Sequence, residues 1–271
     1  MNPRRYRPFG LAVLCALLAM PLARPARAAD DTTLMLRQPS VSAMQIAFAH
    51  AQNIWVVARA GGDAIRLTSF QGQASNPRFS PDGEWIAFSG EYAGNLDVYV
   101  VAATGGEPRR LTWHPGADQV QGWTPDGKAI VFASGRASWA PSPAPRFWTV
   151  PAAGGQEQPM VLPRAFQGRV SPDGKRVAYR LNNSWDDERR NYRGGQNRPV
   201  WITTLATLET VTPEWKDSKD IDPVWLADRV YFISDRDDVA NVWSCDKEGK
   251  DLQQHIGSAT STSRRSMPAQ A

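Results

Sequence analysis

The sequence predicts an all-β protein, a β-propeller built from four-stranded antiparallel blades. A Pro-Asp-Gly turn occurs three times at a nearly constant interval, in Ser80–Gly83, Thr124–Gly127 and Ser171–Gly174. Short apolar runs flank each copy, as expected for antiparallel strands joined by tight turns. Helical periodicity of about 3.6 residues is hard to find elsewhere in the chain. Together, these three observations favour a β-repeat protein over a helical or mixed fold.

The clearest copy of the repeat surrounds the first turn and divides into four expected strands. Pro77–Phe79 precedes the turn, and Trp85–Phe88 follows it as a run of apolar and aromatic residues favoured in strands. Asp97–Val101 is the third expected strand, and after Gly105-Gly106 a fourth begins over Arg110–Thr112. Four strands in about 45 residues have the size of one propeller blade.

Five copies of this pattern can be counted. The turns begin at residues 80, 124 and 171, which gives intervals of 44 and 47 residues. A further copy, Asp222–Trp243, keeps the strands but has lost the turn residues, and an earlier partial copy covers Met44–Phe70. Three turns at this interval, each framed by the same strands, indicate a repeat, whereas a single Pro-Asp-Gly turn would not.

The N-terminus has the pattern of a secretory signal peptide over residues 1–28. Three arginines precede an apolar run, Leu11–Leu22, and Ala26-Arg27-Ala28 offers a small-residue cleavage site. A membrane anchor is the less favoured reading, because the apolar run is about half of the ~20 residues that a span needs. We therefore expect a periplasmic or secreted protein with no stable membrane insertion after cleavage.

Removal of this leader changes the charge and the cysteine chemistry. Residues 1–28 hold five arginines and no acid, so Lys+Arg falls from 31 to 26 against 27 Asp+Glu and the net charge moves from +4 to −1. The basic isoelectric point is thus no indication of nucleic-acid binding. Cys245 is the one cysteine beyond the leader, which excludes an intrachain disulfide and predicts a half-buried free thiol.

Nothing in the sequence indicates a catalytic, metal or cofactor site. His50, His114 and His255 stand far apart, each without a neighbouring ligand at metal-binding spacing. The glycine pairs match no phosphate-binding loop, and no G-x-S-x-G nucleophile motif occurs. The repetition of Ser-Pro-Asp-Gly argues against a catalytic Ser-Asp pair. The sequence therefore predicts no catalytic residue, no metal and no cofactor.

The insertion Ser184–Pro199 is the longest departure from the repeat and the candidate binding site. Long loops on a rigid scaffold often carry function, and aromatic and arginine side chains are enriched at binding hot spots. A solvated loop, in which Asp186, Asp187 and Glu188 neutralise Arg189 and Arg190, is the alternative interpretation. The predicted peptide- or partner-binding residues are Trp185, Tyr192, Arg193 and Arg198.

These repeats resemble those of known propeller families. The strand-turn-strand pattern with "SDRDDVANVW" resembles the propeller repeat of TolB-type periplasmic proteins. The first propeller of tricorn-type proteases is a closer resemblance, over about Leu34–His255. It includes "NYRGGQNRPVWI" at Asn191–Ile202 and "DKEGKDLQQH" at Asp246–His255, which are more specific than the turns.

The resemblance implies a long protease with a six-bladed and a seven-bladed propeller, a PDZ-like module and a serine peptidase domain, in which propellers channel peptides and dock partners. We therefore expect the non-catalytic propeller portion of an exported tricorn-type serine protease. A stand-alone TolB-like periplasmic interaction protein is the alternative, and a propeller enzyme is favoured least. The expected parts are five blades of a six-bladed ring over residues 34–258 and an unstructured tail over 259–271. Such a chain would be a truncated or frameshifted product of a longer gene.

Overall fold

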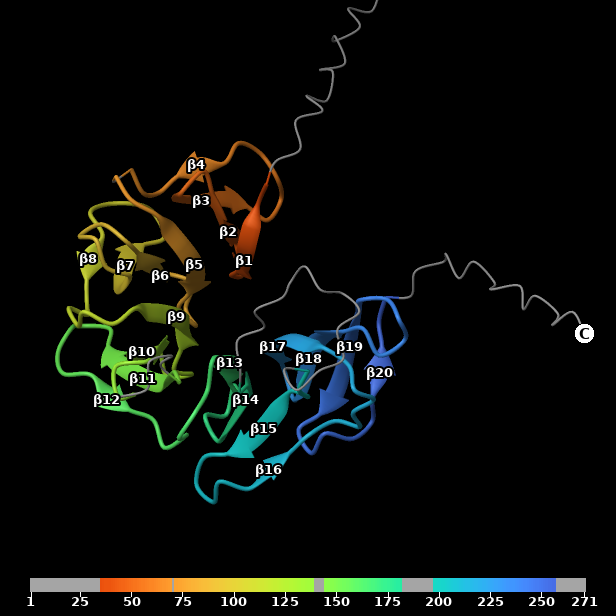
Figure 1. Ribbon diagram of the computed structural model, residues 1–271. Helices are drawn as coiled ribbons and strands as arrows, with labels where there is room; N and C mark the ends of the chain where they lie inside the picture. Colours follow the sequence, from red (N-terminus) through yellow and green to blue (C-terminus); the bar gives the residue numbers. More distant parts are fainter. Residues whose placement is uncertain (1–34, 70, 139–143, 182–196, 257–271) are drawn as a thin grey trace, which may run out of the picture. The chain divides into compact units, whose positions relative to one another are not determined.

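Five four-stranded antiparallel sheets form the described part of the chain and are arranged as a β-propeller, as the sequence predicts (Figure 1). The computed structural model describes residues 35–69, 71–138, 144–181 and 197–256, all of them within one compact unit, Met35–Ala271. In these ranges no helix is long and apolar enough to cross a membrane. The expected leader and tail lie outside the described residues.

Each blade takes four strands that are consecutive in the sequence. Blade 1 contains β1 (Arg37–Val41), β2 (Gln45–His50), β3 (Asn53–Ala58) and β4 (Ile65–Arg66). Blade 2 contains β5 (Ala74–Phe79), β6 (Trp85–Gly90), β7 (Asp97–Ala102) and β8 (Arg109–Arg110). Blade 3 contains β9 (Asp118–Trp123), β10 (Ala129–Ser134), β11 (Arg146–Pro151) and β12 (Gln158–Pro159). Blade 4 contains β13 (Gln167–Val170), β14 (Arg176–Arg180), β15 (Trp201–Thr204) and β16 (Thr210–Val211). Blade 5 contains β17 (Asp220–Leu226), β18 (Arg229–Ser234), β19 (Asn241–Asp246) and β20 (Gln253–Gln254).

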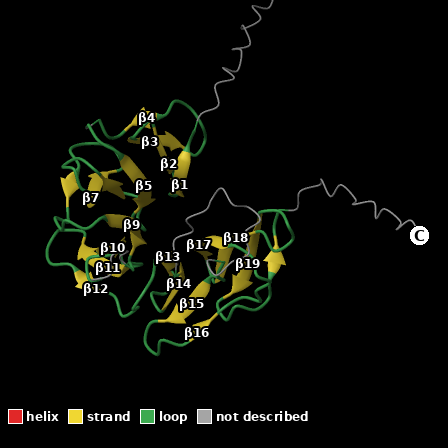
Figure 2. Ribbon diagram, viewed as in Figure 1, coloured by secondary structure: helices red, strands yellow, loops and turns green. Residues whose placement is uncertain are grey.

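The first strand of every blade lies innermost, and the fourth lies at the outer edge (Figures 1 and 2). Neighbouring inner strands contact one another in sequence order, β1 with β5, β5 with β9, β9 with β13 and β13 with β17. The side chains of these strands therefore meet residues of adjacent blades as well as of their own sheet.

The apolar core is divided among the spaces between blades. On β6, Ile86 and Phe88 pack with Ile54 of blade 1, whereas Ala87 between them packs with Ile130 of blade 3. Successive strand residues point to opposite faces of a sheet, so one short apolar run supplies both faces. Such continuous runs, including "WIAF" and "AIVF", are therefore the sequence signature of a sheet that is covered on both sides.

The repeated turns have the predicted geometry. Gly83, Gly127 and Gly174 have φ of 78°, 69° and 72°, a region in which an L side chain is strained. Each turn also contacts the next one along the chain. A Cβ at Gly127 would lie 3.6 Å from the Pro81 ring, and one at Gly174 would lie 3.8 Å from the Pro125 ring. The turns thus form a row along one side of the propeller.

The outer strands are shorter than the sequence predicts, because a threonine side chain replaces backbone pairing. In blade 2 the fourth strand ends at Arg110, and the Val98 N–H donates to Thr112 Oγ1 at 3.0 Å. The Ile54 N–H donates to Thr68 Oγ1 at 3.0 Å in the same way in blade 1. In the recurring Arg-Leu-Thr sequence, the fourth strand thus ends at the arginine, and the threonine hydroxyl accepts the next N–H of the third strand.

Most inner strands carry a β-bulge that the sequence pattern does not predict. Strand register shifts occur between Ser75 and Arg78 and at matching places in blades 1 and 5. Gln38, Asn76 and Asp222 lie at these shifts with φ of 54°, 51° and 53°, each directly before a proline. A residue before proline is ordinarily extended, so these positions hold an uncommon conformation. Proline suits a bulge, because it has no N–H to pair.

Replacement of Gly174 with valine should lower the free energy of unfolding by about 1–3 kcal/mol, because valine is strained at positive φ. Chemical denaturation of the full chain measures this loss. Lys175→Ala, at the exposed neighbouring position, is the matched control and should change stability little. Unchanged stability of Gly83→Val, Gly127→Val and Gly174→Val together would contradict the assigned turn geometry.

Candidate functional site

The predicted binding loop lies mostly outside the described residues. Trp185, Tyr192 and Arg193 belong to the undescribed segment, and the hypothesis that they bind a peptide or partner stays a prediction. Arg198 is described, and its side chain is exposed just before β15. Of the four predicted residues, the described part of the chain therefore contains one, and it lies on the surface.

A groove of about 290 Å³ lies between blades 2 and 3, on the side of the Pro-Asp-Gly turns. Blade 2 supplies a turn, the start of β6 and the first residue of β8, and blade 3 supplies the end of β9 and the chain after β11. The lining residues are Ser80, Asp82, Trp85, Val100, Arg109, Trp123, Gly127, Ala152 and Ala153.

Three side chains give this groove its chemistry. Trp85 is 42% exposed, although tryptophan usually buries most of its surface. Arg109 crosses the boundary between blades, where its Nη1 donates to the Ala153 carbonyl and its Nη2 to the Ala152 carbonyl, both at 2.6 Å. Together with the Asp82 carboxylate, the groove offers an aromatic face, a cation and an anion.

A tryptophan from the following blade fixes the inner wall of the groove. Trp123 Nε1 donates to the Arg78 carbonyl of blade 2 at 2.9 Å. Trp225 Nε1 donates in the same way to the Arg169 carbonyl of blade 4 at 3.1 Å. A second groove of about 160 Å³ lies beside Trp225, lined by Ser171, Pro172, Asp173, Arg176, Trp225, Ala227, Asp228 and Lys247. The groove is thus a feature of the repeat, and its first copy is the larger.

The serine and aspartate in the larger groove serve the turn. Ser80 Oγ donates to Asp82 Oδ1 at 2.5 Å and accepts from the Trp85 N–H at 2.9 Å. The Ser80 hydroxyl and then the Glu84 N–H lower the pKa of Asp82. The equivalent hydroxyls of Thr124 and Ser171 bond their own aspartates in the same way. This recurrence explains the motif without any catalytic role.

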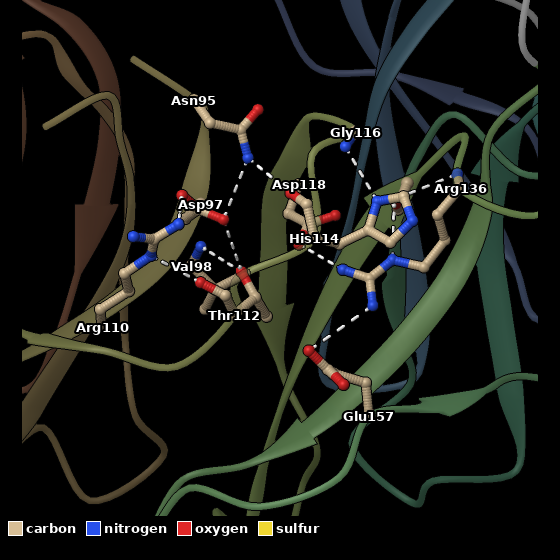
Figure 3. A network of polar contacts seen from close by, with 11 residues as sticks. Asn95, Asp97, Val98, Arg110, Thr112, His114, Gly116, Asp118, Arg136 and Glu157 are labelled. Carbon is tan, nitrogen blue, oxygen red and sulfur yellow. Dashed lines mark hydrogen bonds and ion pairs between the residues drawn. The ribbon is translucent and has the colours of Figure 1, made fainter. Parts of the chain in front are cut away.

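Two buried carboxylates, Asp97 and Asp118, form a polar network at the opposite end of β9 from the Trp123 that lines the groove (Figure 3). Asp97 pairs with Arg110 at 2.7 Å, and Asp118 pairs with Arg136. Both aspartate side chains are fully buried. Burial raises the pKa of Asp97, Arg110 opposes this rise, and the nearby Asp118 adds to it. Each carboxylate thus depends on its own arginine for compensating charge.

Hydrogen bonds from side chains and backbone join these two ion pairs across the blades. Asn95 Nδ2 donates to Asp97 Oδ1 at 3.2 Å and to the His114 carbonyl at 2.6 Å (Figure 3). The His114 ring accepts the Gly116 N–H through Nδ1 at 2.8 Å. The Asp118 N–H donates to the Leu96 carbonyl at 2.7 Å. The segment between blades 2 and 3 is therefore held by the same polar network.

Blade 5 repeats the arrangement around Arg136. In blade 3 the Arg136 guanidinium carbon lies 5.2 Å from the ring centres of Phe132 and Trp148. In blade 5 Arg236 pairs with Asp220 at 3.2 Å and lies over the rings of Phe232 and Trp243. An arginine that is paired on one side and stacked on the other is held in a fixed position.

The histidines and the cysteine are the remaining side chains with metal-binding chemistry. In the described ranges no group of three His, Cys, Asp or Glu residues is placed to hold a metal ion. His255 shares a hydrogen bond of 2.7 Å with Ser244 Oγ. Cys245 is fully buried rather than half-buried, and burial raises the pKa of its thiol to about 12. A neutral, enclosed thiol is poorly reactive.

Sequence reasoning missed the groove, because its residues come from separate parts of two repeats. Trp85 carried the one available signal. It begins β6 at the position that Ala129 and Arg176 hold in the next two blades, and it is exposed where those two residues are half-buried. A single exposed aromatic residue is a weak signal, and it gains meaning once Trp85 is seen beside Val100 and Trp123 in the groove.

Residues 33–266 match the protein family described as the tricorn protease N-terminal beta propeller domain. Tricorn protease homologs 2 and 1 of Streptomyces coelicolor are each 30% identical to the chain, over 86% and 81% of it. A tricorn protease homolog of Saccharolobus solfataricus is 27% identical over 80% of the chain. The chain spans 20% of the length of each of these relatives.

Solved structures show the same fold at lower identity. The tricorn protease crystal structure superposes with a TM-score of 0.66 and 24% identity, over 83% of this chain and 22% of that one. A TolB from Agrobacterium tumefaciens superposes with a TM-score of 0.66 and 20% identity, over 82% of this chain and 81% of that one.

Replacement of Arg136 with methionine should lower the free energy of unfolding by about 3–5 kcal/mol, because it leaves the Asp118 carboxylate buried without its cation. Arg66→Met, on the exposed strand β4, is the matched control. The double variant Asp118→Leu with Arg136→Met should recover part of the loss, since no charge then stays buried. Equal stabilities of Arg136→Met and the control in urea denaturation would contradict this account.

Proposed function

Because the chain belongs to the family of tricorn protease N-terminal β-propeller domains, we propose that it is the non-catalytic propeller portion of a tricorn-type serine protease. In this role it binds or channels peptides during proteolysis, and the nucleophile belongs to another part of the protease. Family membership over residues 33–266 supports the first statement. The groove between blades 2 and 3 is the observation that carries the second.

The groove suits an extended peptide in three ways. The exposed Trp85 ring gives an apolar surface against which a peptide side chain can stack. Asp82 Oδ1 is used within the turn, and Oδ2 is left to accept a peptide N–H. Arg109 is fixed in position by two carbonyls. Aromatic and arginine side chains of this kind dominate binding energies at protein surfaces.

The proposed setting is the periplasm or the exterior of the cell. The support is the leader pattern of residues 1–28, a basic segment followed by an apolar run and a small-residue cleavage site. The proposed partners are peptides or other proteins, and the net charge of −1 without the leader gives no support for nucleic acid.

A stand-alone interaction protein of the TolB type is the second candidate. Its support is the fold, since the similarity to the Agrobacterium tumefaciens TolB extends over 81% of that chain. The two proposals predict different ligands, and a binding experiment can therefore distinguish them. A tricorn-type propeller should bind unstructured peptides in the groove, whereas a TolB-like protein should bind a folded partner and leave short peptides free.

Trp85→Ala should weaken the binding of an unstructured, uncharged peptide by about 5-fold or more, the usual effect of removing a binding aromatic residue. Isothermal titration calorimetry of the full chain measures the dissociation constant. Trp113→Ala removes a comparably exposed tryptophan that does not line the groove, and it should leave binding unchanged. Equal loss in both variants would contradict a peptide site at the groove.

The full chain should hydrolyse no peptide. Ser80 and its equivalents donate their protons to turn aspartates, which leaves these hydroxyls without an activating histidine. Incubation with a pool of unstructured peptides, followed by mass spectrometry, should show no products. Cleavage that survives stringent purification and is abolished by mutation of one serine would overturn the non-catalytic assignment.

A further inference from the structure

Two arginines occupy the same position on the inner strands of alternate blades. Arg78 and Arg169 each stand two residues before the serine of the turn, on β5 and β13. Strand pairing confirms the equivalence, since Arg78 pairs with Ala87 and Arg169 with Ala178 in their own blades. Both residues are half-buried. The inner face of the propeller therefore carries two cations at one level.

The strand between them brings these side chains together. Arg78 Nε donates to the Gln121 carbonyl of β9 at 3.3 Å, from the side of blade 2. Arg169 lies over the next residue from the side of blade 4, since a Cβ at Gly122 would be 3.5 Å from its Cδ. Glycine at the matching position of blade 3 leaves the space that the Arg169 side chain uses. The two arginines thus converge on one dipeptide.

Neither guanidinium has an anionic partner among the described residues. The other hydrogen bonds of Arg78 go to the carbonyls of Pro77 at 2.7 Å and Gln38 at 3.5 Å. Arg169 Nη1 donates to the Gly168 carbonyl at 2.9 Å. By contrast, Arg110, Arg136, Arg229 and Arg236 each pair with an aspartate. Carbonyl groups orient a guanidinium but leave its charge uncompensated.

The electrostatics agree with this geometry. Burial lowers the pKa of Arg78 to about 10, so the residue stays charged at neutral pH. Burial and then the charge of Arg78 lower the pKa of Arg169. Asp222 of blade 5 acts on both arginines in the opposite direction, and its carboxylate already accepts a hydrogen bond from Gln167. Among the described residues, the one carboxylate that acts on both arginines is therefore shared between them.

We propose that Arg78 and Arg169 together bind a carboxylate on the inner face of the propeller, presented by an acidic side chain of a peptide. The identity of the ligand rests on the proposed peptide-binding function, whereas the oxyanion site itself does not. Guanidinium groups match carboxylates in shape and donate several N–H groups to them. Arg169 is the main donor in this site, because one N–H contact to the protein engages it. Arg78 is the positioned partner, since three carbonyls fix it.

The test uses the full chain and three peptides of otherwise identical sequence. The first has blocked ends and carries glutamates, the second has blocked ends and glutamines instead, and the third is the glutamine peptide with a free C-terminal carboxylate. In about 0.05 M salt, where screening is weak, the glutamate peptide should bind about 5-fold more tightly than the blocked glutamine peptide. Arg169→Gln should remove this preference, and Arg66→Gln, which removes an exposed arginine of β4, should keep it.

Two outcomes would overturn the proposal. One is equal affinity of the glutamate and blocked glutamine peptides for the unmodified chain. The other is a preference confined to the peptide with the free C-terminal carboxylate. If Arg169→Gln is poorly folded, Arg169→Lys takes its place in the test. This variant keeps the positive charge but loses the planar set of guanidinium donors, so it should retain only part of the preference for the glutamate peptide.

Inorganic phosphate tests the oxyanion site independently of the proposed peptide-binding function. Phosphate should raise the melting temperature of the unmodified chain and of Arg66→Gln more than that of Arg169→Gln, whether or not peptides bind. If phosphate gives this result and no peptide binds, the peptide-binding function fails and the oxyanion site stands. If the melting temperatures of all three proteins respond equally to phosphate, the oxyanion site fails.

Discussion

The described structure depends on one constraint: a sheet that lies between two others must bury one face against each neighbouring blade. Phe88 of blade 2 packs toward blade 1, and the adjacent Ala87 packs toward blade 3. A blade therefore has no core of its own, and its apolar residues are buried where two sheets meet. Hydrophobic burial is the main favourable term in folding, so the blades stabilise one another. The grooves and the interblade contacts of Arg78 and Arg109 lie at the same boundaries.

Three fully buried aspartates, Asp97, Asp118 and Asp220, lie at the same boundaries, and each pairs with an arginine. Asp118 with Arg136 in blade 3 and Asp220 with Arg236 in blade 5 occupy equivalent places, each arginine lying over two aromatic rings. A buried pair adds little net stability compared with apolar residues of the same volume, but a half of a pair is strongly destabilising. In blades 3 and 5, a substitution of the aspartate therefore requires a matching substitution of its arginine. Arg78 and Arg169 on the inner strands differ from this arrangement, because neither has an anionic partner in the part of the chain that the structure describes.

The sequence predicted the blades well because the turn residues and the short continuous apolar runs are local signals. Gly127 and the run after it suffice to place two strands of blade 3. The bulges were beyond such reasoning, because Asn76 before a proline is expected to be extended and instead has positive φ. The groove could not be predicted either, because Trp85, Arg109 and Trp123 meet only when two blades pack. The long loop is visible in the sequence because it interrupts the repeat, whereas the groove arises from the repeat itself.

The row of turns has a consequence for how such a chain can change in evolution. The Pro81 ring lies against Gly127, and the Pro125 ring lies against Gly174, so each turn shows one residue to the copy before it and another to the copy after it. A duplicated copy of the whole unit would present the same two surfaces and would join the row without new adjustment. A duplicated segment of any other length would shift the later glycines away from the prolines that they meet. Gene duplication in steps of one full repeat is therefore the route to lengthening that this geometry allows at least cost.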